Sequence, residues 1–277
     1  MKYVPFTKAT ACGNDFILVE SARVEGDQGE FTRRICDRHD GVGADGVEWM
    51  APSSVADLEI HLINADGSVA EISGNGTRCV AAFWSADKRM DRVTIQTDAG
   101  PRVCHRVRRT GAGFECKEAG LELEGAEFEF ETEMGAATVG ESLALALRDG
   151  PVQGIPVATG NPHYVIFAEA FPADWQRQAQ EIGAHPQFPW GVNVEWVRVR
   201  GEREIEIRIY ERGAGETLSS GTGSCAAAIA AIATGRAQSP VRVTSPGGAQ
   251  TVRWENGAIM LRGPARIICR GEFLWTQ

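Results

Sequence analysis

Two short sequences in this chain combine a serine hydroxyl with glycine-rich backbone, and each precedes a run of small residues. Ser73 opens the sequence SGNG, and Ser220 opens SGTG. The runs that follow, TRCVAAFWSADK and SCAAAIAAIATG, carry small and apolar residues at helical spacing. The start of a helix exposes unpaired N–H groups and carries partial positive charge, and glycines there let an anion approach the backbone closely. Each sequence therefore predicts a seat for a small carboxylate.

These two sequences belong to a longer internal repeat. Ser73 and Ser220 lie 147 positions apart. The same offset aligns three further landmarks: Gly13 and Asn14 with Gly160 and Asn161, Val47–Trp49 with Val194–Trp196, and Asn64 with Glu211. A single recurring glycine turn is common in unrelated proteins. A constant offset across four landmarks instead predicts two homologous halves. If the halves face each other, their two helix starts converge on one cleft. One serine would then take a proton from a ligand and the other would return it.

The residue pattern predicts the same elements in both halves. Strands are expected at 15–20, 47–50, 57–64 and 91–120 in the first half, and at 163–169, 194–199, 204–211 and 241–270 in the second, with short helices at 29–39 and 172–185. Gly183 and Gly235 are placed to end helices. The fold class is therefore α+β, with two pseudo-symmetric domains, each a curved, mostly antiparallel sheet wrapped around a central helix. The expected domains are 1–120 plus 266–277, and 121–265.

Composition excludes several classes of protein. The net charge of -9 argues against a nucleic-acid partner, because phosphate binding depends on clustered Lys and Arg. No apolar run approaches the roughly 20 residues that span a membrane, and the N-terminus lacks the pattern of a secretory signal, so a cytoplasmic protein is expected. The 7 cysteines form no C-x-x-C pair and are expected to be buried thiols. The 5 histidines show no metal-ligand spacing, so no metal is expected.

Several longer segments carry a resemblance to a known family. The segments are CGNDFILVE, NADGSVAEISGNGTRC, GNPHYVIF, GVNVE and YERGAGETLSSGTGSCAAA. Over almost its whole length the chain resembles diaminopimelate epimerase. The resemblance implies a homodimeric isomerase that needs no pyridoxal phosphate or other cofactor. Its reaction would interconvert LL- and meso-2,6-diaminopimelate by two-base proton exchange at the α-carbon, for lysine and cell-wall synthesis.

The resemblance also implies a role for individual residues. It places the two catalytic groups at Ser73 and Ser220. It assigns the distal end of the substrate to Asn64, Asn161, Asn193 and Arg212, the reacting end to Asn14 and Glu211, and the α-carboxylate to the backbone N–H groups of Gly74, Asn75, Gly221 and Thr222. Amides and one arginine suit a ligand with ammonium and carboxylate groups. Taken singly, the three distal asparagines are more typical of turns than of a binding site, and His163 is at least as typical of a packed, hydrogen-bonded histidine.

The chain departs from the family at both catalytic positions, where the family carries cysteine. A thiol at a helix N-terminus ionises near neutral pH, whereas a serine hydroxyl is a far weaker acid. Neither motif contains an adjacent general base that would activate it, and Cys79 and Cys225 lie too far into the following helices to substitute. Three interpretations stay open: an inactivated epimerase, a slow serine variant, or a relative with changed chemistry. The last would be a non-catalytic amino-acid-binding protein or a racemase of another amino acid.

Overall fold

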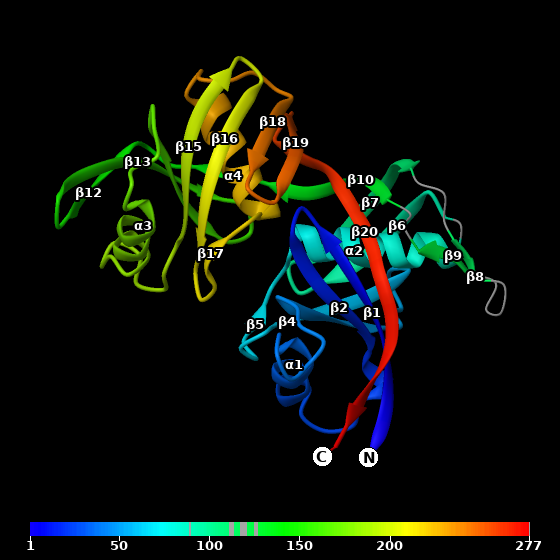
Figure 1. Ribbon diagram of the computed structural model, residues 1–277. Helices are drawn as coiled ribbons and strands as arrows, with labels where there is room; N and C mark the ends of the chain where they lie inside the picture. The colour runs from blue at the N-terminus through cyan, green and yellow to red at the C-terminus, as the bar shows by residue number, and fades with distance from the viewer. Residues whose placement is uncertain (89, 111–113, 117–120, 125–126, 277) are drawn as a thin grey trace. The chain divides into compact units, whose positions relative to one another are not determined.

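The chain folds into two compact units. The computed structural model describes residues 1–88, 90–110, 114–116, 121–124 and 127–276 (Figure 1). Unit 1 comprises Met1–Thr132 and Gly263–Gln277, and unit 2 comprises Glu133–Arg262. The boundaries fall inside strands β10 (Glu127–Ala136) and β20 (Ala258–Trp275), so each of these strands contributes to both units.

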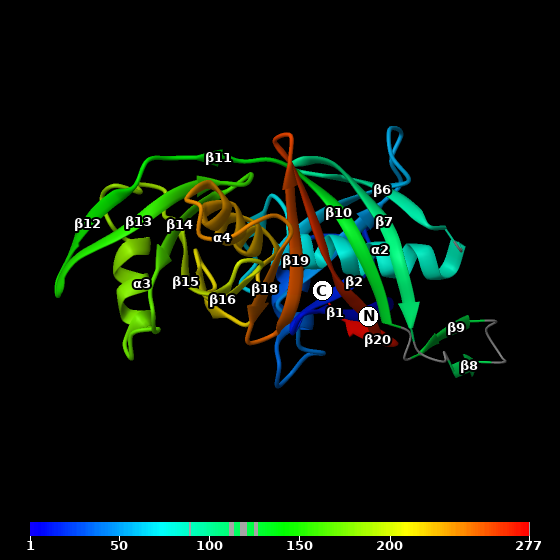
Figure 2. The ribbon, with the colours of Figure 1, turned by 90° about the horizontal axis from the view of Figure 1, so that it is seen from above.

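Unit 1 is a sheet that closes on itself around helix α2 (Gly74–Lys88) (Figures 1 and 2). The hydrogen-bonded order is β1, β2, β3, β4, β6, β7, β10 and β20, and β20 pairs again with β1. The strands are β1 (Lys2–Ala11), β2 (Asn14–Glu20), β3 (Gly46–Ala51), β4 (Leu58–Asn64), β5 (Val69–Ala70), β6 (Arg92–Thr97), β7 (Gly100–Thr110), β8 (Phe114–Cys116) and β9 (Leu121–Glu124). Closure pairs the strand edges and encloses the buried residues of the helix, among them Cys79–Ala82.

The core of unit 1 has two layers, one on each face of strands β2 and β3. Inside the closed sheet, the buried α2 residues from Cys79 to Ala82 pack against Phe128 and Phe130. On the outer face, α1 (Gln28–Cys36) packs Phe31 against Trp49. Strand β3 is therefore covered on both sides, and its burial is continuous from Gly46 to Met50. The remaining helical turn is the short η1 (Ser21–Arg23).

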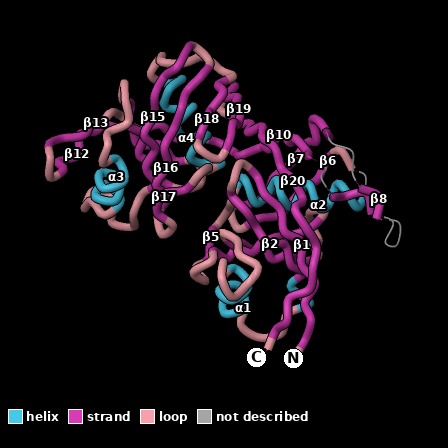
Figure 3. Tube along the Cα trace, viewed as in Figure 1, coloured by secondary structure: helices cyan, strands magenta, loops and turns pink. Residues whose placement is uncertain are grey.

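Unit 2 repeats this arrangement around helix α4 (Gly221–Ala233) (Figure 3). Its strands are β11 (Thr138–Val139), β12 (Leu143–Leu147), β13 (Gly150–Ala158), β14 (Pro162–Phe167), β15 (Asn193–Gly201), β16 (Glu204–Glu211), β17 (Gly215–Thr217), β18 (Val241–Ser245) and β19 (Gly248–Glu255). Helix α3 (Trp175–Gly183) covers the outer face. Gly235, with φ of 68°, receives the end of α4 through hydrogen bonds that link it and Arg236 to Ile232 and Ala231. This is a Schellman motif, which confirms the predicted helix end.

Strand registers confirm the internal repeat. In unit 1, Phe16 pairs with Gly46 and Val47 with Ile63. The residues 147 positions later pair in the same way in unit 2, His163 with Asn193 and Val194 with Tyr210. Solved structures with the same fold, described below, agree with the predicted fold class.

Two predicted helices are shorter than the sequence pattern indicated. The first ends at Cys36 because Asp37 turns to extended backbone, and its carboxylate accepts hydrogen bonds from the N–H groups of His39 and Asp40. The second begins at Trp175, after a turn in which the Trp175 N–H donates to the Pro172 carbonyl. Its predicted end at Gly183 is confirmed.

The described residues also bear on the composition arguments. Within them, no helix is both long and apolar enough to cross a membrane. The same residues contain no cluster of three His, Cys, Asp or Glu side chains that could hold a metal ion. The side chain of Cys116 lies outside the description. Of the other six cysteines, all free thiols, five are buried, as predicted, whereas Cys269 is only partly buried.

Candidate active site

Both serines of the S-G-x-G sequences are helix N-caps. The Oγ of Ser73 accepts a hydrogen bond from the Gly76 N–H at 3.0 Å, and the Oγ of Ser220 accepts one from the Gly223 N–H at 3.1 Å. A cap of this kind satisfies the third N–H of the helix. The first two N–H groups, which have no carbonyl partner within a helix, belong to Gly74 and Asn75 in α2 and to Gly221 and Thr222 in α4.

A buried glutamate lies directly behind each capped glycine. A Cβ atom added to Gly76 would lie 1.8 Å from Glu48 Oε1, and one added to Gly223 would lie 2.7 Å from Glu195 Oε1. A side chain at either position would force the carboxyl group of the glutamate to move, so glycine suits both positions. Glu48 and Glu195 are themselves 147 positions apart and are fully buried. Sequence reasoning used them as landmarks of the repeat and missed their location.

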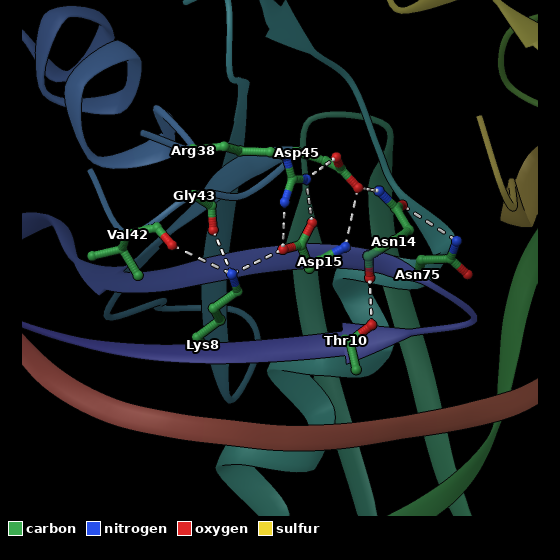
Figure 4. Close-up of polar contacts among 9 residues, drawn as sticks. All are labelled: Lys8, Thr10, Asn14, Asp15, Arg38, Val42, Gly43, Asp45 and Asn75. Carbon is green, nitrogen blue, oxygen red and sulfur yellow. Dashed lines mark hydrogen bonds and ion pairs between the residues drawn. The ribbon is translucent and has the colours of Figure 1, made fainter. Parts of the chain in front are cut away.

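In unit 1, Asn14 is held by a network of charged side chains (Figure 4). The Asn14 side-chain N–H donates to Asp45 Oδ2, and its Oδ1 accepts from Asn75 Nδ2 at 3.3 Å. These two bonds fix which end of the amide is donor and which is acceptor. The amide retains one N–H and one lone pair for a ligand. The predicted residues Asn14, Ser73, Gly74 and Asn75 are thus brought together at the start of α2.

The charges around this network hold its members in place. Arg38 donates to Asp15 and to Asp45 at 2.8 Å, and Lys8 Nζ lies 3.0 Å from Asp15 Oδ2. Burial raises the pKa of Asp15, but hydrogen bonds from Arg38 and Lys8 outweigh burial and hold the pKa below its usual value. Asp15 therefore stays ionised and anchors both cations. The network can orient Asn14 over a wide range of pH.

Asn64 occupies a different setting from the other predicted residues of unit 1. It is the last residue of β4, and its side-chain N–H donates to Ser68 Oγ at 3.0 Å while its backbone N–H donates to the Ser68 carbonyl at 2.8 Å. These are the contacts of a turn residue, the simpler of the two interpretations of this asparagine. No described hydrogen bond joins Asn64 to Asn14 or Ser73.

In unit 2, a chain of side chains runs from the start of α4 to the buried glutamate. Asn161 Nδ2 donates to Thr222 Oγ1 at 3.4 Å, and Asn161 Oδ1 lies 2.8 Å from His163 Nε2. His163 Nδ1 lies 2.7 Å from Glu195 Oε1, and both side chains are fully buried. His163 is the packed, hydrogen-bonded histidine that its sequence context allowed. Asn161 contacts the second residue of the helix, as its repeat partner Asn14 does in unit 1, but it donates to Thr222, whereas Asn14 accepts from Asn75.

The protons of this chain can be assigned from its contacts. Because Asn161 uses its amide N–H groups as donors, its Oδ1 must accept, and His163 Nε2 must carry a proton. The single proton between His163 Nδ1 and Glu195 then lies on one of them. In either case the pair has no net charge. Burial raises the pKa of Glu195, and His163 opposes the increase.

Glu211 supplies a carboxyl group beside Ser220. Burial raises the pKa of Glu211, and the neighbouring Ser220 hydroxyl partly opposes the increase. Ser220 therefore has a neighbouring carboxyl group, although its own S-G-x-G sequence contains none. The base comes from the end of β16, nine residues before the serine, and is absent from the S-G-x-G sequence itself. In unit 1 the corresponding residue is Asn64, which cannot serve as a base.

Arg212 and Asn193, two of the predicted site residues of unit 2, contact each other. The Asn193 Oδ1 accepts the Arg212 backbone N–H at 2.8 Å, and the Arg212 guanidinium donates to the Trp190 carbonyl at 2.9 Å. The Arg212 side chain is exposed and forms no ion pair with any carboxylate of the described chain. It keeps donors for a carboxylate of a ligand.

The fold is shared with several solved enzymes. Hydroxyproline epimerase from Agrobacterium vitis, solved with bound trans-4-hydroxy-L-proline, superimposes with a TM-score of 0.73 at 15% identity, covering 99% of this chain and 91% of that protein. A phenazine biosynthesis protein of the PhzF family from Bacillus anthracis gives a TM-score of 0.70 at 16% identity, covering 99% and 100%. At these identities the likeness concerns the fold alone. The chain thus belongs to the structural class that includes these proteins.

Sequence comparison is more specific. The family model described as diaminopimelate epimerase matches residues 6–114 and 156–268. The chain is 37% identical to diaminopimelate epimerase of Pelotomaculum thermopropionicum, covering 97% of this chain and 98% of the relative. It is 35% identical to diaminopimelate epimerase of Azoarcus sp., covering 98% of each. The chain belongs to the diaminopimelate epimerase family.

Proposed function

We propose that this chain is a diaminopimelate epimerase, an isomerase that interconverts LL- and meso-2,6-diaminopimelate. One group would remove the α-proton, and a second would return a proton to the opposite face of the carbon. The observation that carries the proposal is the duplicated helix start. Ser73 and Ser220 each cap a helix whose next two N–H groups suit a carboxylate. Family membership supplies the reaction to which this arrangement is suited.

The α-carboxylate would be held by the N–H groups of the first two helix residues in each unit. Negative charge that develops on this carboxylate as the α-proton leaves would be stabilised by the same groups and by the partial positive charge of the helix start. The amide of Asn14, fixed by Asp45, would add one side-chain hydrogen bond. The exposed guanidinium of Arg212 would bind the carboxylate at the distal end of the substrate.

The proton exchange itself would be slow with the serines in place. A hydroxyl is a weaker acid than a thiol by several pKa units, so little alkoxide is present near neutral pH. Ser220 has Glu211 beside it, and the raised pKa of that carboxyl suits a general base. Ser73 has no equivalent, because Asn64 stands at the corresponding position. We therefore propose residual activity that is limited by Ser73.

The test is exchange of the α-proton in deuterated water. The purified chain incubated with diaminopimelate should incorporate deuterium slowly, and the Ser73→Cys, Ser220→Cys double variant should incorporate it orders of magnitude faster. Ser53→Cys is the matched control, because Ser53 Oγ also accepts backbone N–H groups, from Val55 and Ala56. No gain in the double variant, or an equal gain in the control, would count against the catalytic assignment.

A second candidate is an amino-acid-binding protein without catalysis. The observation that favours it is that both serines are complete N-caps, so each has a structural reason to be serine. On this view Arg212→Ala weakens binding of a ligand with two amino-acid ends, while restoring cysteine changes no exchange rate. Calorimetry with diaminopimelate and with amino acids that have one such end would separate the candidates.

The cellular setting follows from the same family membership. We propose a cytoplasmic homodimer in lysine biosynthesis. A bacterial strain that requires diaminopimelate should grow on the double cysteine variant supplied in its cytoplasm, and light scattering should give twice the mass of one chain. Failure of growth with a variant that is active in vitro would contradict the proposed role.

A further inference from the structure

The two units share the same arrangement of strands and helix, but they differ in the side chains that lie behind the capping serines, Ser73 and Ser220. Glu48 contacts Gly76, whose N–H donates to Ser73 Oγ, and Glu195 makes the equivalent contact with Gly223 in unit 2. In each unit a single residue, the glycine, thus separates the carboxyl group from the serine hydroxyl that would do the chemistry. The difference lies in what the two carboxyl groups can bond with.

Glu195 Oε1 has a hydrogen-bond partner in His163, whereas among the described residues Glu48 has none. The position that corresponds to His163 in unit 1 is Phe16, which is buried and has no polar group. Both carboxyl oxygens of Glu48 are buried without a hydrogen-bond partner in the described chain. The His163–Glu195 pair in unit 2 has no net charge while it shares a single proton. Glu48 is without charge only while it keeps its own proton.

The surroundings of Glu48 do little to stabilise a charge. On α2, Arg78 directs its guanidinium to the Gly74 carbonyl and to Asn75 Oδ1, while the neighbouring thiol of Cys79 is buried. Asp15 on β2 is already paired with Lys8 and Arg38, and His61 on β4 is paired with Asp98. Burial, with a smaller effect from Asp98, raises the pKa of Glu48 to about 8. The carboxyl is therefore neutral near pH 7 and ionises just above it.

We propose that Glu48 is a positioning residue for the group at position 73: its carboxyl seats Gly76 and sets the electrostatic field that an anion experiences at the start of α2. The proposal rests on the proposed function only for its effect on turnover. While the carboxyl is neutral, the positive end of α2 is available to a carboxylate or to a thiolate at position 73. Once it ionises, a negative charge lies directly behind the same N–H groups and opposes that anion.

The field at the start of α2 should therefore depend on pH through Glu48, whereas at the start of α4 Glu195 is paired with His163 and the carboxyl group that can ionise beside Ser220 is Glu211. A bound anion in turn makes ionisation of Glu48 harder, so the loss should be gradual and centred above the pKa of the free protein. Proton transfer at the two faces of the α-carbon should then be limited separately at alkaline pH. Only the face served by unit 1 is limited by Glu48.

The first experiment needs no substrate. In a Ser73→Cys variant, the thiol introduced at position 73 is alkylated with iodoacetate, an anion, and with neutral iodoacetamide, and the labelled peptide is quantified by mass spectrometry. The ratio of the two rates should fall about tenfold between about pH 6.5 and about pH 9.5, as for a shift of one pKa unit. Adding Glu48→Gln should make the ratio constant, because the amide cannot ionise. A Ser220→Cys, Glu211→Gln variant, alkylated at the thiol introduced at position 220, is the matched control; because Glu211 can no longer ionise beside that thiol, the ratio should be constant.

Each outcome decides the question. An equal fall with and without Glu48→Gln, or a fall at position 220 as large as at position 73, would overturn the proposal even if the protein is an active epimerase. Should Glu48→Gln fail to fold, Phe16→His is measured instead, since it supplies the partner that His163 supplies in unit 2. Phe16→His should make the ratio of the two alkylation rates at position 73 nearly independent of pH. An unchanged fall of that ratio with pH would overturn the proposal.

The second experiment measures turnover. In the Ser73→Cys, Ser220→Cys background, KM for diaminopimelate should rise above about pH 8, and Glu48→Gln should suppress that rise while leaving kcat near neutral pH unchanged. A loss of kcat at every pH would indicate a merely structural role and refute the proposal. If no epimerisation is found at all, the proposed function fails, whereas the alkylation ratio still decides the role of Glu48.

Discussion

Replacing Glu48 by glutamine should stabilise unit 1, and the gain should grow with pH. The substitution keeps the shape of the buried side chain and removes its ability to ionise. The pKa of Glu48 rises from 4.5 to about 8 on folding. Between these values the folded protein holds a proton that the unfolded chain has released, so the stability of the parent protein falls as pH rises through this window. This sign is opposite to that of a carboxylate in a salt bridge.

The size of the effect follows from the width of the window. One pKa unit corresponds to about 1.4 kcal/mol, so the penalty at pH 7 is about 3 kcal/mol and levels off near about 5 kcal/mol above pH 8. At pH 4 both states are protonated, and the two proteins should differ by about 1 kcal/mol or less, as expected for exchanging one buried polar group for another. A gain of this size is large against the usual stability of a domain.

Hydrogen exchange under native conditions is the suitable assay, because it reports each unit separately where two-state unfolding is not assured. The free energies of opening of β3 and α2 amides are compared between the parent and Glu48→Gln proteins from about pH 5 to about pH 8. Glu195→Gln is the matched control: it removes one member of the His163 pair and should lower the stability of β15 and α4 instead. A difference at Glu48 that stays constant with pH, or a parent protein that gains stability towards pH 8, would refute the reasoning.

Three further predictions concern the same helix starts. Ser73→Cys and Ser220→Cys should each cost about 1 kcal/mol of stability through the weaker cap, measured by urea unfolding, and Ser53→Cys serves as comparison. Gly76→Ala should destabilise its unit more than Gly223→Ala, because the added Cβ would lie 1.8 Å from Glu48 Oε1 against 2.7 Å from Glu195 Oε1; equal losses in hydrogen exchange would contradict this. Asp45→Ala should release the Asn14 amide and raise KM about tenfold with little change in kcat in the double cysteine background, whereas Asp40→Ala, in the adjoining turn, should leave KM unchanged.

Much of the fold was accessible from the sequence because the repeat carries its own internal check. Val47–Trp49 and Val194–Trp196 fixed the offset, and the strand pairings reproduce it. The two helix limits at Cys36 and Trp175 were less accessible. They depend on an aspartate that turns the chain and on a loop around Pro172, and helical periodicity does not register either feature.

The buried glutamates could not be placed from the same pattern. A charged residue inside a strand normally indicates a face exposed to solvent. In β3 that rule fails, because α2 covers one face and α1 the other, so Glu48 is enclosed whichever way it points. Coverage of both faces is a property of the tertiary fold. The useful signal was the recurrence of glutamate at the same place in both halves.

The serines illustrate why residue chemistry and local architecture must be separated. Judged by acidity, serine at positions 73 and 220 indicates lost catalysis. Judged by the helix, serine is among the best residues for an N-cap, and both hydroxyls act as one. The substitution therefore leaves the helix start, its N–H groups and the glutamate behind each glycine undisturbed. The carboxylate seat and the proton-transfer group are separable parts of the site, and binding can persist in a chain whose exchange rate is low.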